Sequence, residues 1–205
     1  FDSNDNFWVG TNDGLYLSSD MGTSWKEIDT THGTLEIPVP RFSDFVEHKD
    51  KIFGLSQRGL YYSENKDTNW VEMDTTFFLE RRATYLASNK HEMYMTVDAE
   101  GIYRSTDGGN TWMLFGEEFA GNRFSEIITY GSNVFTVVSY EANGIYNRSS
   151  LFFSNNNAET WTKISEVLPN KLINDIIIKD DYLYAATSFG IYRSPLADYS
   201  INSVT

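Results

Sequence analysis

The stretch Gly101-Ile102-Tyr103-Arg104-Ser105-Thr106-Asp107-Gly108-Gly109-Asn110-Thr111-Trp112 contains the two patterns on which the interpretation of the whole chain depends. The first is a triplet of glycine, an aliphatic residue and tyrosine, which occurs five times with steps of 45, 42, 43 and 46 residues. Its copies are Gly14-Leu15-Tyr16, Gly59-Leu60-Tyr61, Gly101-Ile102-Tyr103, Gly144-Ile145-Tyr146 and Gly190-Ile191-Tyr192. Five copies at nearly one spacing indicate a chain built from a repeated unit of about 43 residues.

Tryptophans recur at a nearly fixed distance after the triplet. One follows the triplet glycine by eleven residues in the first three units, as Trp25, Trp70 and Trp112, and by seventeen in the fourth, as Trp161. The difference, 17 − 11, indicates an insertion of six residues in the fourth unit.

Within each unit the pattern of side chains is typical of β-strands. Apolar and polar residues alternate, many of them aromatic or β-branched, and Gly, Asn and Asp interrupt the runs. In the third unit we expect four short strands, at 83–88, 93–97, 102–105 and 112–115. Four short strands in every unit of about 43 residues are typical of a propeller blade. We therefore predict an all-β fold, a β-propeller of four-stranded antiparallel blades.

The chain holds about five such blades, which we expect to form a single domain over residues 1–205. The repeat units are 1–30, 42–74, 83–116, 124–165 and 173–205. Neither end is a complete blade, because the first unit starts at what looks like a second strand and the fifth lacks the turn described next. Two alternatives follow: a small closed ring, to which residues 196–205 add a strand, or the C-terminal part of a larger propeller, which we favour.

Between the third and fourth strands lies the second pattern, Ser-x-Asp-x-Gly-x-Ser/Thr-Trp. It is intact at 18–25 and 105–112, while worn copies at 63–70 and 154–161 have Asn in place of Asp and lack the Gly. A tight hairpin needs a side-chain oxygen to accept backbone N–H groups, a glycine for the positive-φ position and a tryptophan to seal the turn. The predicted turn residues are Ser18, Asp20, Gly22, Trp25, Ser63, Asn65, Trp70, Ser105, Asp107, Gly109, Trp112, Ser154, Asn156 and Trp161.

At these residues the chain resembles the Asp-box family, also called BNR repeats, known from sialidases and from many non-enzymatic propellers. The resemblance covers nearly the whole chain and implies that the turns are structural and lie on the outer part of each blade, away from the ligand face. The segment Ser194-Pro195-Leu196-Ala197-Asp198 is also similar to the propeller end of secreted bacterial proteins. The resemblance therefore implies a bacterial protein that is secreted or lies on the cell surface.

Composition excludes several classes of function. Sixteen Lys plus Arg against 29 Asp plus Glu give a net charge of −13, which repels phosphate backbones and anionic lipid, so we expect no nucleic acid partner and no membrane insertion. The absence of cysteine rules out disulfides, thiolate nucleophiles and cysteine-based metal sites. Since His32, His48 and His91 lack the spacing of metal ligands, we predict neither a metal nor a cofactor.

Cations recur where the chain enters the innermost strands, which is where propellers usually bind their ligands. When the units are aligned on the aromatic residue of the second strand, Arg41, Arg82 and Arg123 each lie twelve residues before it. In the fourth aligned unit Leu172 has this place, with Lys171 beside it. Equivalent strand entries lie around one rim, so these four cations form a candidate anion site in an otherwise acidic protein.

Nine residues before the same aromatic residue come Asp44, Tyr85, Glu126 and Asp175. One interpretation is a set of rim ion pairs, such as Arg41 with Asp44 and Arg123 with Glu126, each worth about 0 to 1 kcal/mol if exposed. The other is that the arginines clamp a carboxylate or sulfate with their bidentate forks. The sequence leaves both open.

The family resemblance raises the question of catalysis. Sialidases use an arginine triad, a tyrosine–glutamate nucleophile pair and an aspartate acid, but their Arg-Ile-Pro motif is missing here, and Tyr140 with Glu141 is only one of many possible pairs. We therefore predict a non-catalytic binding or scaffold module for an acidic glycan or a protein partner. A glycoside hydrolase of sialidase type, or a fragment of one, is the alternative, and a purely architectural spacer is a third.

Overall fold

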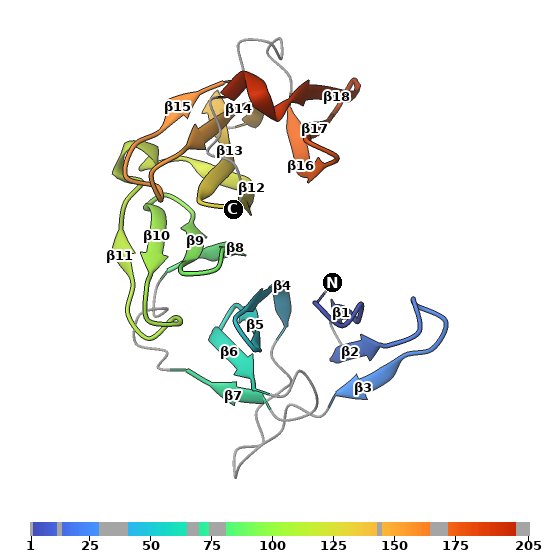
Figure 1. The fold of residues 1–205 in the computed structure, drawn as a ribbon. Helices are drawn as coiled ribbons and strands as arrows, with labels where there is room; N and C mark the ends of the chain where they lie inside the picture. The colour runs from blue at the N-terminus through green and yellow to red at the C-terminus, as the bar shows by residue number, and fades with distance from the viewer. Residues whose placement is uncertain are drawn as a thin grey trace.

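The computed structural model describes residues 2–11, 14–28, 41–64, 70–73, 81–142, 145–164 and 172–199. These residues form five antiparallel sheets of three or four strands, which follow one another around an arc in sequence order (Figure 1). We call them blades A to E. Each is a meander of strands in chain order, so the predicted all-β propeller architecture is confirmed. That the whole chain is one domain stays a prediction.

The strands of the blades are as follows. Blade A has β1 (Phe7–Gly10), β2 (Leu15–Ser18) and β3 (Lys26–Ile28), and blade B has β4 (Phe42–His48), β5 (Lys51–Ser56), β6 (Gly59–Ser63) and β7 (Trp70–Glu72). Blade C has β8 (Ala83–Ser88), β9 (Met93–Val97), β10 (Gly101–Ser105) and β11 (Met113–Leu114), followed by the 3-10 helix η2 (Glu117–Phe119). Blade D has β12 (Arg123–Tyr130), β13 (Asn133–Ala142), β14 (Ile145–Ser154) and β15 (Thr162–Lys163). Blade E has β16 (Ile173–Lys179), β17 (Tyr182–Thr187) and β18 (Gly190–Pro195), followed by η4 (Leu196–Tyr199).

Strands β4, β8, β12 and β16 line the inner side of the arc, each beside the next. Every substantial contact between strands of different blades joins blades that are consecutive in the sequence. The arc is open between blades E and A (Figure 1). The core accordingly consists of four buried clusters, one between each pair of consecutive blades.

The repeated triplet supplies side chains to two of these clusters at once. Its aliphatic residue faces the next blade: Leu60 of blade B lies in one cluster with Met95 of blade C, and Ile102 of blade C lies in another with Ile127 of blade D. Its tyrosine faces the previous blade, since Tyr103 of blade C lies in the cluster with Leu60. The triplet therefore joins each blade to both of its neighbours.

The triplet glycine allows a close approach of two backbone segments. At Gly101 the backbone φ is +146°, and a Cβ atom there would lie 2.4 Å from the carbonyl oxygen of Gly116. No L-residue with a side chain fits this position without a shift of the backbone.

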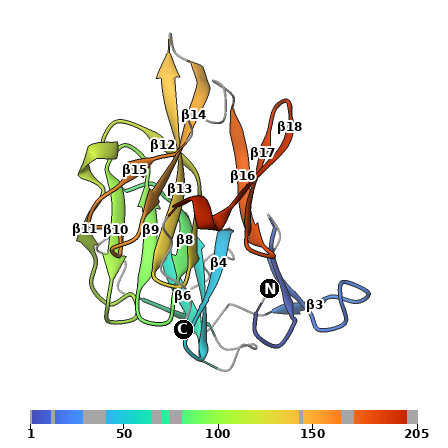
Figure 2. The ribbon, with the colours of Figure 1, turned by 45° about the horizontal axis from the view of Figure 1, so that its top comes forward.

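The six-residue insertion lengthens the central hairpin of blade D. Strands β13 and β14 have 10 residues each, and their hairpin extends beyond the other blades (Figure 2). Leu151 lies opposite Val137, the place that the aliphatic triplet residue has in the other blades, whereas Ile145 pairs with Ala142 within the extension. The prediction that Gly144-Ile145-Tyr146 is the fourth equivalent triplet is therefore wrong. Ser150-Leu151-Phe152 holds that place, because the insertion comes before it.

The turn after β10 is closed by side-chain hydrogen bonds. The Oδ1 and Oδ2 atoms of Asp107 accept from the backbone N–H and the hydroxyl of Thr111 at 2.9 and 2.7 Å. The Ser105 hydroxyl donates to Asp107 at 2.8 Å and accepts the backbone N–H of Gly109 at 2.8 Å. Gly109 has a φ of +86°, and the Trp112 indole donates to its carbonyl at 3.0 Å. These are the roles that a tight hairpin assigns to each residue type.

The same bonds recur in the turns of blades A and D. Asp20 accepts the backbone N–H of Ser24 at 2.8 Å, and Asn156 accepts that of Thr160 at 3.0 Å. In blade D, Ala158 has a φ of +67° in place of a glycine. An asparagine oxygen is therefore enough to close the turn. The turn serines also have the predicted role, since Ser18 accepts the backbone N–H of Gly22 and Ser154 accepts that of Ala158. In blade B, Asn65 lies outside the described residues, and Ser63 and Trp70 on either side of it are buried.

The tryptophans of these turns pack on the preceding blade rather than on their own turn alone. Trp70 lies 5.6 Å from Trp8 of blade A between ring centroids, and Trp161 lies 5.5 Å from Phe119, which follows blade C. The expectation that each tryptophan is sealed against the sheet is wrong for Trp25, which is 45% exposed. Among the described residues, no blade precedes blade A to cover its ring.

The residues just after blade E do not form the strand that the closed-ring alternative expects from them. Residues 196–199 form the 3-10 helix η4 and not a ring-closing strand, because Leu196 is buried in the cluster between blades D and E. Residues 200–205 lie outside the described residues. No helix in the described part of the chain is long and apolar enough to cross a membrane.

We expect the Asp107→Ala substitution to lower the free energy of unfolding by about 0.5–1.5 kcal/mol, because it removes the hydrogen bonds from Thr111 that close the turn. Asp107→Asn keeps one acceptor oxygen, as Asn156 does in blade D, and should cost clearly less. Urea unfolding of the two variants measures both values. Equal losses for Ala and Asn would show that the side-chain oxygen does not stabilise the turn.

Candidate functional site

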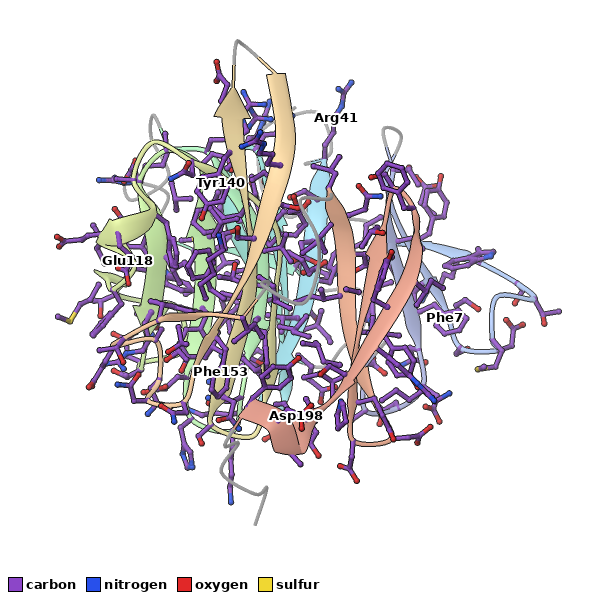
Figure 3. The ribbon with its side chains drawn as sticks, turned by 90° about the horizontal axis from the view of Figure 1, so that it is seen from above. Phe7, Arg41, Glu118, Tyr140, Phe153 and Asp198 are labelled. Carbon is purple, nitrogen blue, oxygen red and sulfur yellow. The ribbon has the colours of Figure 1, made fainter. Side chains whose placement is uncertain are left out.

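The predicted rim cations stand where the innermost strands begin. Arg41 precedes β4, Arg82 precedes β8, and Arg123 is the first residue of β12. Figure 3 shows Arg41 projecting from the edge of the arc, away from the blades. Lys171 lies outside the described residues. The structure thus puts three arginines at equivalent entry points on one rim.

Two of these arginines share one carboxylate. Asp98, in the turn after β9, has its Oδ2 atom 3.5 Å from Arg82 Nε and 3.9 Å from Arg123 Nε. Its side chain is only 9% exposed, whereas those of Arg82 and Arg123 are 69% and 48% exposed. Asp98 therefore lies beneath two guanidinium groups that remain open to solvent.

Asp98 also links blades C and D. Its Oδ1 atom accepts the backbone N–H of Phe124 in β12 at 3.2 Å. Burial raises the pKa of the Asp98 carboxyl, although this hydrogen bond and the positive charges of Arg82 and Arg123 act to lower it. The buried anion is thus held by the blade that follows it and by two rim cations.

The rim ion pair expected between Arg41 and Asp44 does not form. Asp44 instead accepts the backbone N–H of Leu86 in blade C at 2.7 Å and that of Phe45 at 2.8 Å. Its carboxylate is therefore an inter-blade acceptor. Arg41 is exposed and has no ion pair with another described residue.

A bulge near the start of each innermost strand turns one residue out of register. The pairing shifts between Phe42 and Asp44, and at the equivalent places in β8, β12 and β16, just before Tyr85, Glu126 and Asp175. Bulges commonly re-aim a side chain in this way. The unpaired residues are Ser43, Thr84, Ser125 and Asn174, and the residue that follows each of them resumes the pairing with the second strand.

Two of these carboxyl groups have strongly raised pKa values. Burial raises the pKa of Glu126 to about 7, and repulsion from Asp44 and Asp175 adds to this effect, while a hydrogen bond from Ile127 N–H opposes it. Burial likewise raises the pKa of Asp44 to about 6, against two backbone hydrogen bonds that lower it. Both carboxyl groups therefore titrate near neutral pH. A perturbed carboxyl of this kind marks a candidate site.

Next to the rim, a groove of about 500 Å3 runs between blades B and C. Arg81 and Arg82 form one part of its wall, and residues with hydroxyl or amide groups form most of the rest; the lining residues are Ser43, Ser56, Gln57, Arg81, Arg82, Ala83, Thr84 and Tyr85. Arg81 Nε is 3.0 Å from Glu100, which also accepts the Tyr103 hydroxyl at 2.6 Å. The groove thus combines an anchored cation, an exposed cation and neutral hydrogen-bonding groups.

This arrangement suits a ligand that carries a carboxylate together with peptide-like or hydroxyl groups. A guanidinium has five donors, and at Arg82 a single ion pair longer than 3 Å uses few of them. The sequence alone did not reveal Asp98, Arg81 or Gln57. Asp98 follows a predicted second strand, but in a chain with 29 Asp and Glu residues nothing in the sequence distinguishes it. In the described residues, no group of three or more His, Cys, Asp or Glu side chains could hold a metal ion.

Comparison with known proteins shows which sequences and folds the chain is similar to. The model of the Sortilin-Vps10 family, described as Sortilin, neurotensin receptor 3, matches residues 13–191. Among curated proteins, no sequence matches the chain closely enough to count as a relative.

Three solved structures of similar fold are distant from this chain in sequence. YCF48 bound to D1 peptide has a TM-score of 0.65 at 15% identity, over 98% of this chain and 62% of that one. PorZ, a surface component of the type-IX secretion system of Porphyromonas gingivalis, has 0.67 at 13%, over 100% and 33%. The GH74 xyloglucanase of Xanthomonas campestris has 0.62 at 13%, over 93% and 34%. The chain therefore spans less than two thirds of each of these proteins, and at such identities the likeness shows the propeller fold alone.

The raised pKa values predict how stability depends on pH. A carboxyl whose pKa is higher in the folded chain stabilises the fold fully below its ordinary pKa of 4.5, and this contribution is lost as the pH rises through about 7. The free energy of unfolding should therefore fall between about pH 5 and about pH 8, and Glu126→Gln should reduce that fall. Glu118→Gln, at an exposed position labelled in Figure 3, is the matched control. If the free energy of unfolding falls as much in Glu126→Gln as in the wild type, the raised pKa of Glu126 is not its cause.

Proposed function

The chain belongs to the Sortilin-Vps10 family, and we propose that it is a non-catalytic propeller module that binds an extended, carboxylate-bearing segment of a protein partner. The binding site is the rim groove between blades B and C together with Arg82 and Arg123. The observation that carries the proposal is that one buried carboxylate, Asp98, holds two exposed guanidinium groups in place.

Asp98 pairs with Arg82 and leaves most of that guanidinium open to solvent. Because its side chain is buried and bonded to Phe124 N–H, it cannot swing out to follow a guanidinium into solvent. An arginine that is already ordered loses less conformational entropy when a ligand binds. The rim is thus preorganised for an incoming carboxylate.

The surroundings favour an acid group at this place and a polar chain beside it. With a net charge of −13, the protein as a whole repels anions, so an acidic segment is attracted only where cations gather locally. Ser43, Ser56 and Gln57 along the groove offer hydrogen-bond partners for peptide groups. One fold neighbour is YCF48 bound to a D1 peptide, which shows that a propeller of this shape can hold a peptide.

We also propose that the protein is secreted or lies on the cell surface and that the turn motifs have a structural role. PorZ, the fold neighbour whose name describes a bacterial surface component, supports a secreted or surface location. The Asp-box turns act as structure, since the carboxylates of Asp20 and Asp107 are occupied by hydrogen bonds within their own turns.

Arg82→Ala should weaken binding of an acidic peptide roughly tenfold or more, since a hydrogen-bonded charge pair contributes about 1.5–3 kcal/mol. The probe is a fluorescein-labelled peptide rich in Asp and Glu, and its Asn and Gln counterpart is the ligand control. Lys163→Ala, on the outer strand β15, is the variant control. Fluorescence anisotropy measures the affinities. If Arg82→Ala and Lys163→Ala bind the acidic peptide equally well, the rim arginines do not form the site.

A second candidate is a glycoside hydrolase, and one observation favours it. Asp44 and Glu126 are half-buried carboxyl groups with pKa values of about 6 and about 7, the range in which a general acid works at neutral pH. Native mass spectrometry with sialylated, uronic-acid and neutral oligosaccharides separates the two functions. Cleaved products that disappear in Glu126→Gln would establish catalysis, and intact acidic adducts alone would assign the rim to a glycan.

A further inference from the structure

A second cavity, of about 350 Å3, lies between blades B and C at the end of the strands away from the rim. His48 is the last residue of β4 and Lys51 the first of β5, whereas the rim arginines stand where the innermost strands begin. A volume of this size is typical of a small-molecule site. We call this cavity the B–C pocket, and its wall residues are His48, Lys49, Asp50, Lys51, Phe53, Tyr62, Met73, Asp107, Gly108 and Asn110.

His48 brings a buried polar group without a partner to this wall. Its side chain is 2% exposed, and neither ring nitrogen has a hydrogen-bond partner in the described part of the chain. Burial and the charge of Lys49 lower the pKa of the imidazole, against an opposing effect of the Asn89 backbone, so the ring is neutral at pH 7 and carries one N–H donor. Buried polar groups are nearly always hydrogen-bonded, and a ligand that accepts from this N–H would account for the exception.

The equivalent space between blades C and D is occupied by a side chain of the protein. Arg104 of blade C donates from Nη1 to the carbonyl oxygen of Asn157, in the turn of blade D, at 2.8 Å. Its guanidinium lies 3.8 Å from the ring centroid of Phe115. Glu92 and Glu159 each have a carboxylate oxygen within 4 Å of the same nitrogen, at 3.8 and 3.9 Å. A cation thus fills this interface, with two carboxylates around it.

The wall of the B–C pocket is made of the counterparts of these residues. Tyr62 lies opposite Phe53 of β5, just as Arg104 lies opposite Tyr94 of β9. Positions relative to that aromatic residue, to the turn serine and to the backbone hydrogen bonds of the triplet identify the others. The counterparts are Tyr62 for Arg104, Met73 for Phe115, Lys51 for Glu92, Gly108 for Asn157 and Asn110 for Glu159.

The centre of the B–C pocket is open where its counterpart is filled. Tyr62 ends in a neutral phenol, and Lys51 Nζ lies 4.2 Å from the centroid of its ring and 3.1 Å from Glu64. Gly108 has the left-handed backbone of its counterpart Asn157, with φ of 73° against 57°. A Cβ atom at Gly108 would meet no heavy atom within 4 Å. The space is therefore available to a ligand.

The charges around the pocket are the reverse of those between blades C and D. The two positions that are carboxylates there are Lys51 and the neutral Asn110 here. Lys49 adds an exposed ammonium that has no ion pair with another described residue. Of the two acids in the wall, Asp107 has both oxygens occupied by hydrogen bonds within its own turn, and Asp50 is exposed. N–H donors therefore predominate, and a carboxylate is their natural complement.

We propose that the B–C pocket binds a small organic carboxylate. Its carboxylate group accepts hydrogen bonds from the ammonium groups of Lys49 and Lys51 and from the imidazole of His48. The remainder of the ligand lies against Phe53 and Met73, the apolar part of the wall. The site is independent of the proposed function, because the B–C pocket and the rim groove share no residue.

Phenylacetate is the probe, and phenylacetamide, which has nearly the same shape but no charge, is the ligand control. Two-dimensional 1H–15N NMR of the imidazole rings follows binding directly, since the chain has only 3 histidines and His48→Gln identifies the His48 signals. Phenylacetate should shift these signals until they saturate, and phenylacetamide should bind at least roughly tenfold more weakly. Equal affinities for the two compounds would overturn the proposal, and so would the absence of any shift with phenylacetate.

Two variants test the wall of the pocket. Lys49→Asn removes an exposed ammonium at a φ of 56°, a left-handed backbone that asparagine also adopts. Tyr62→Arg combined with Lys51→Glu rebuilds in this pocket the arginine–glutamate pair found between blades C and D. Each should weaken phenylacetate binding roughly tenfold. Lys163→Gln, on the outer strand β15, lowers the net charge by the same amount and should leave binding unchanged.

The two variants fail independently. Lys49→Asn changes an exposed side chain and keeps the fold even if the double variant does not. Phenylacetate affinity that is the same in Lys49→Asn as in Lys163→Gln would overturn the proposal, because the ammonium would then take no part in binding. Full affinity in a folded double variant would overturn it as well, since the ligand would have to lie elsewhere.

Discussion

A propeller blade cannot bury its own faces, and the burial of side chains between successive blades is the constraint on which this structure depends. Each four-stranded meander is one sheet thick, so its apolar residues reach a core only through the neighbouring sheets. The triplet meets this need with two adjacent residues that point in opposite directions, as Ile102 and Tyr103 do in blade C. Tryptophans of the turns add to the same interfaces, since Trp70 packs on Trp8 of the preceding blade. The stability of any blade is therefore shared with its neighbours.

The same packing creates the rim. Consecutive blades bring the starts of β4, β8 and β12 side by side, and inter-blade hydrogen bonds from Leu86 to Asp44 and from Phe124 to Asp98 fix them there. Arginines at these starts then point into solvent around one edge. Polar groups that hold consecutive blades together therefore lie beside polar groups available to a ligand, and Asp98 belongs to both sets.

Much of this architecture could be predicted from the sequence because the repeat carries it. Alternation and spacing predicted β8 and β9 at their observed bounds, 83–88 and 93–97. The rim arginines were found in the same way, by alignment of the units. The insertion in blade D could not be placed, because Gly144-Ile145-Tyr146 imitates the triplet, and only strand pairing shows that Leu151 has its role. The partner of Arg82 and Arg123 was also missed, since Asp98 lies in a turn outside the aligned positions, and no periodicity marks it.

Hydrogen–deuterium exchange at low protein concentration is the most direct test of the claim that inter-blade burial holds the fold together. If blades are stabilised through both faces, the amides of β9, β10 and β13, which lie in doubly covered blades, exchange slowest, and those of β1 and β18 in the end blades exchange fastest. Equal protection of β18 and β10 would contradict the account, because it would mean that a blade with one open face is as stable as a blade with two covered ones.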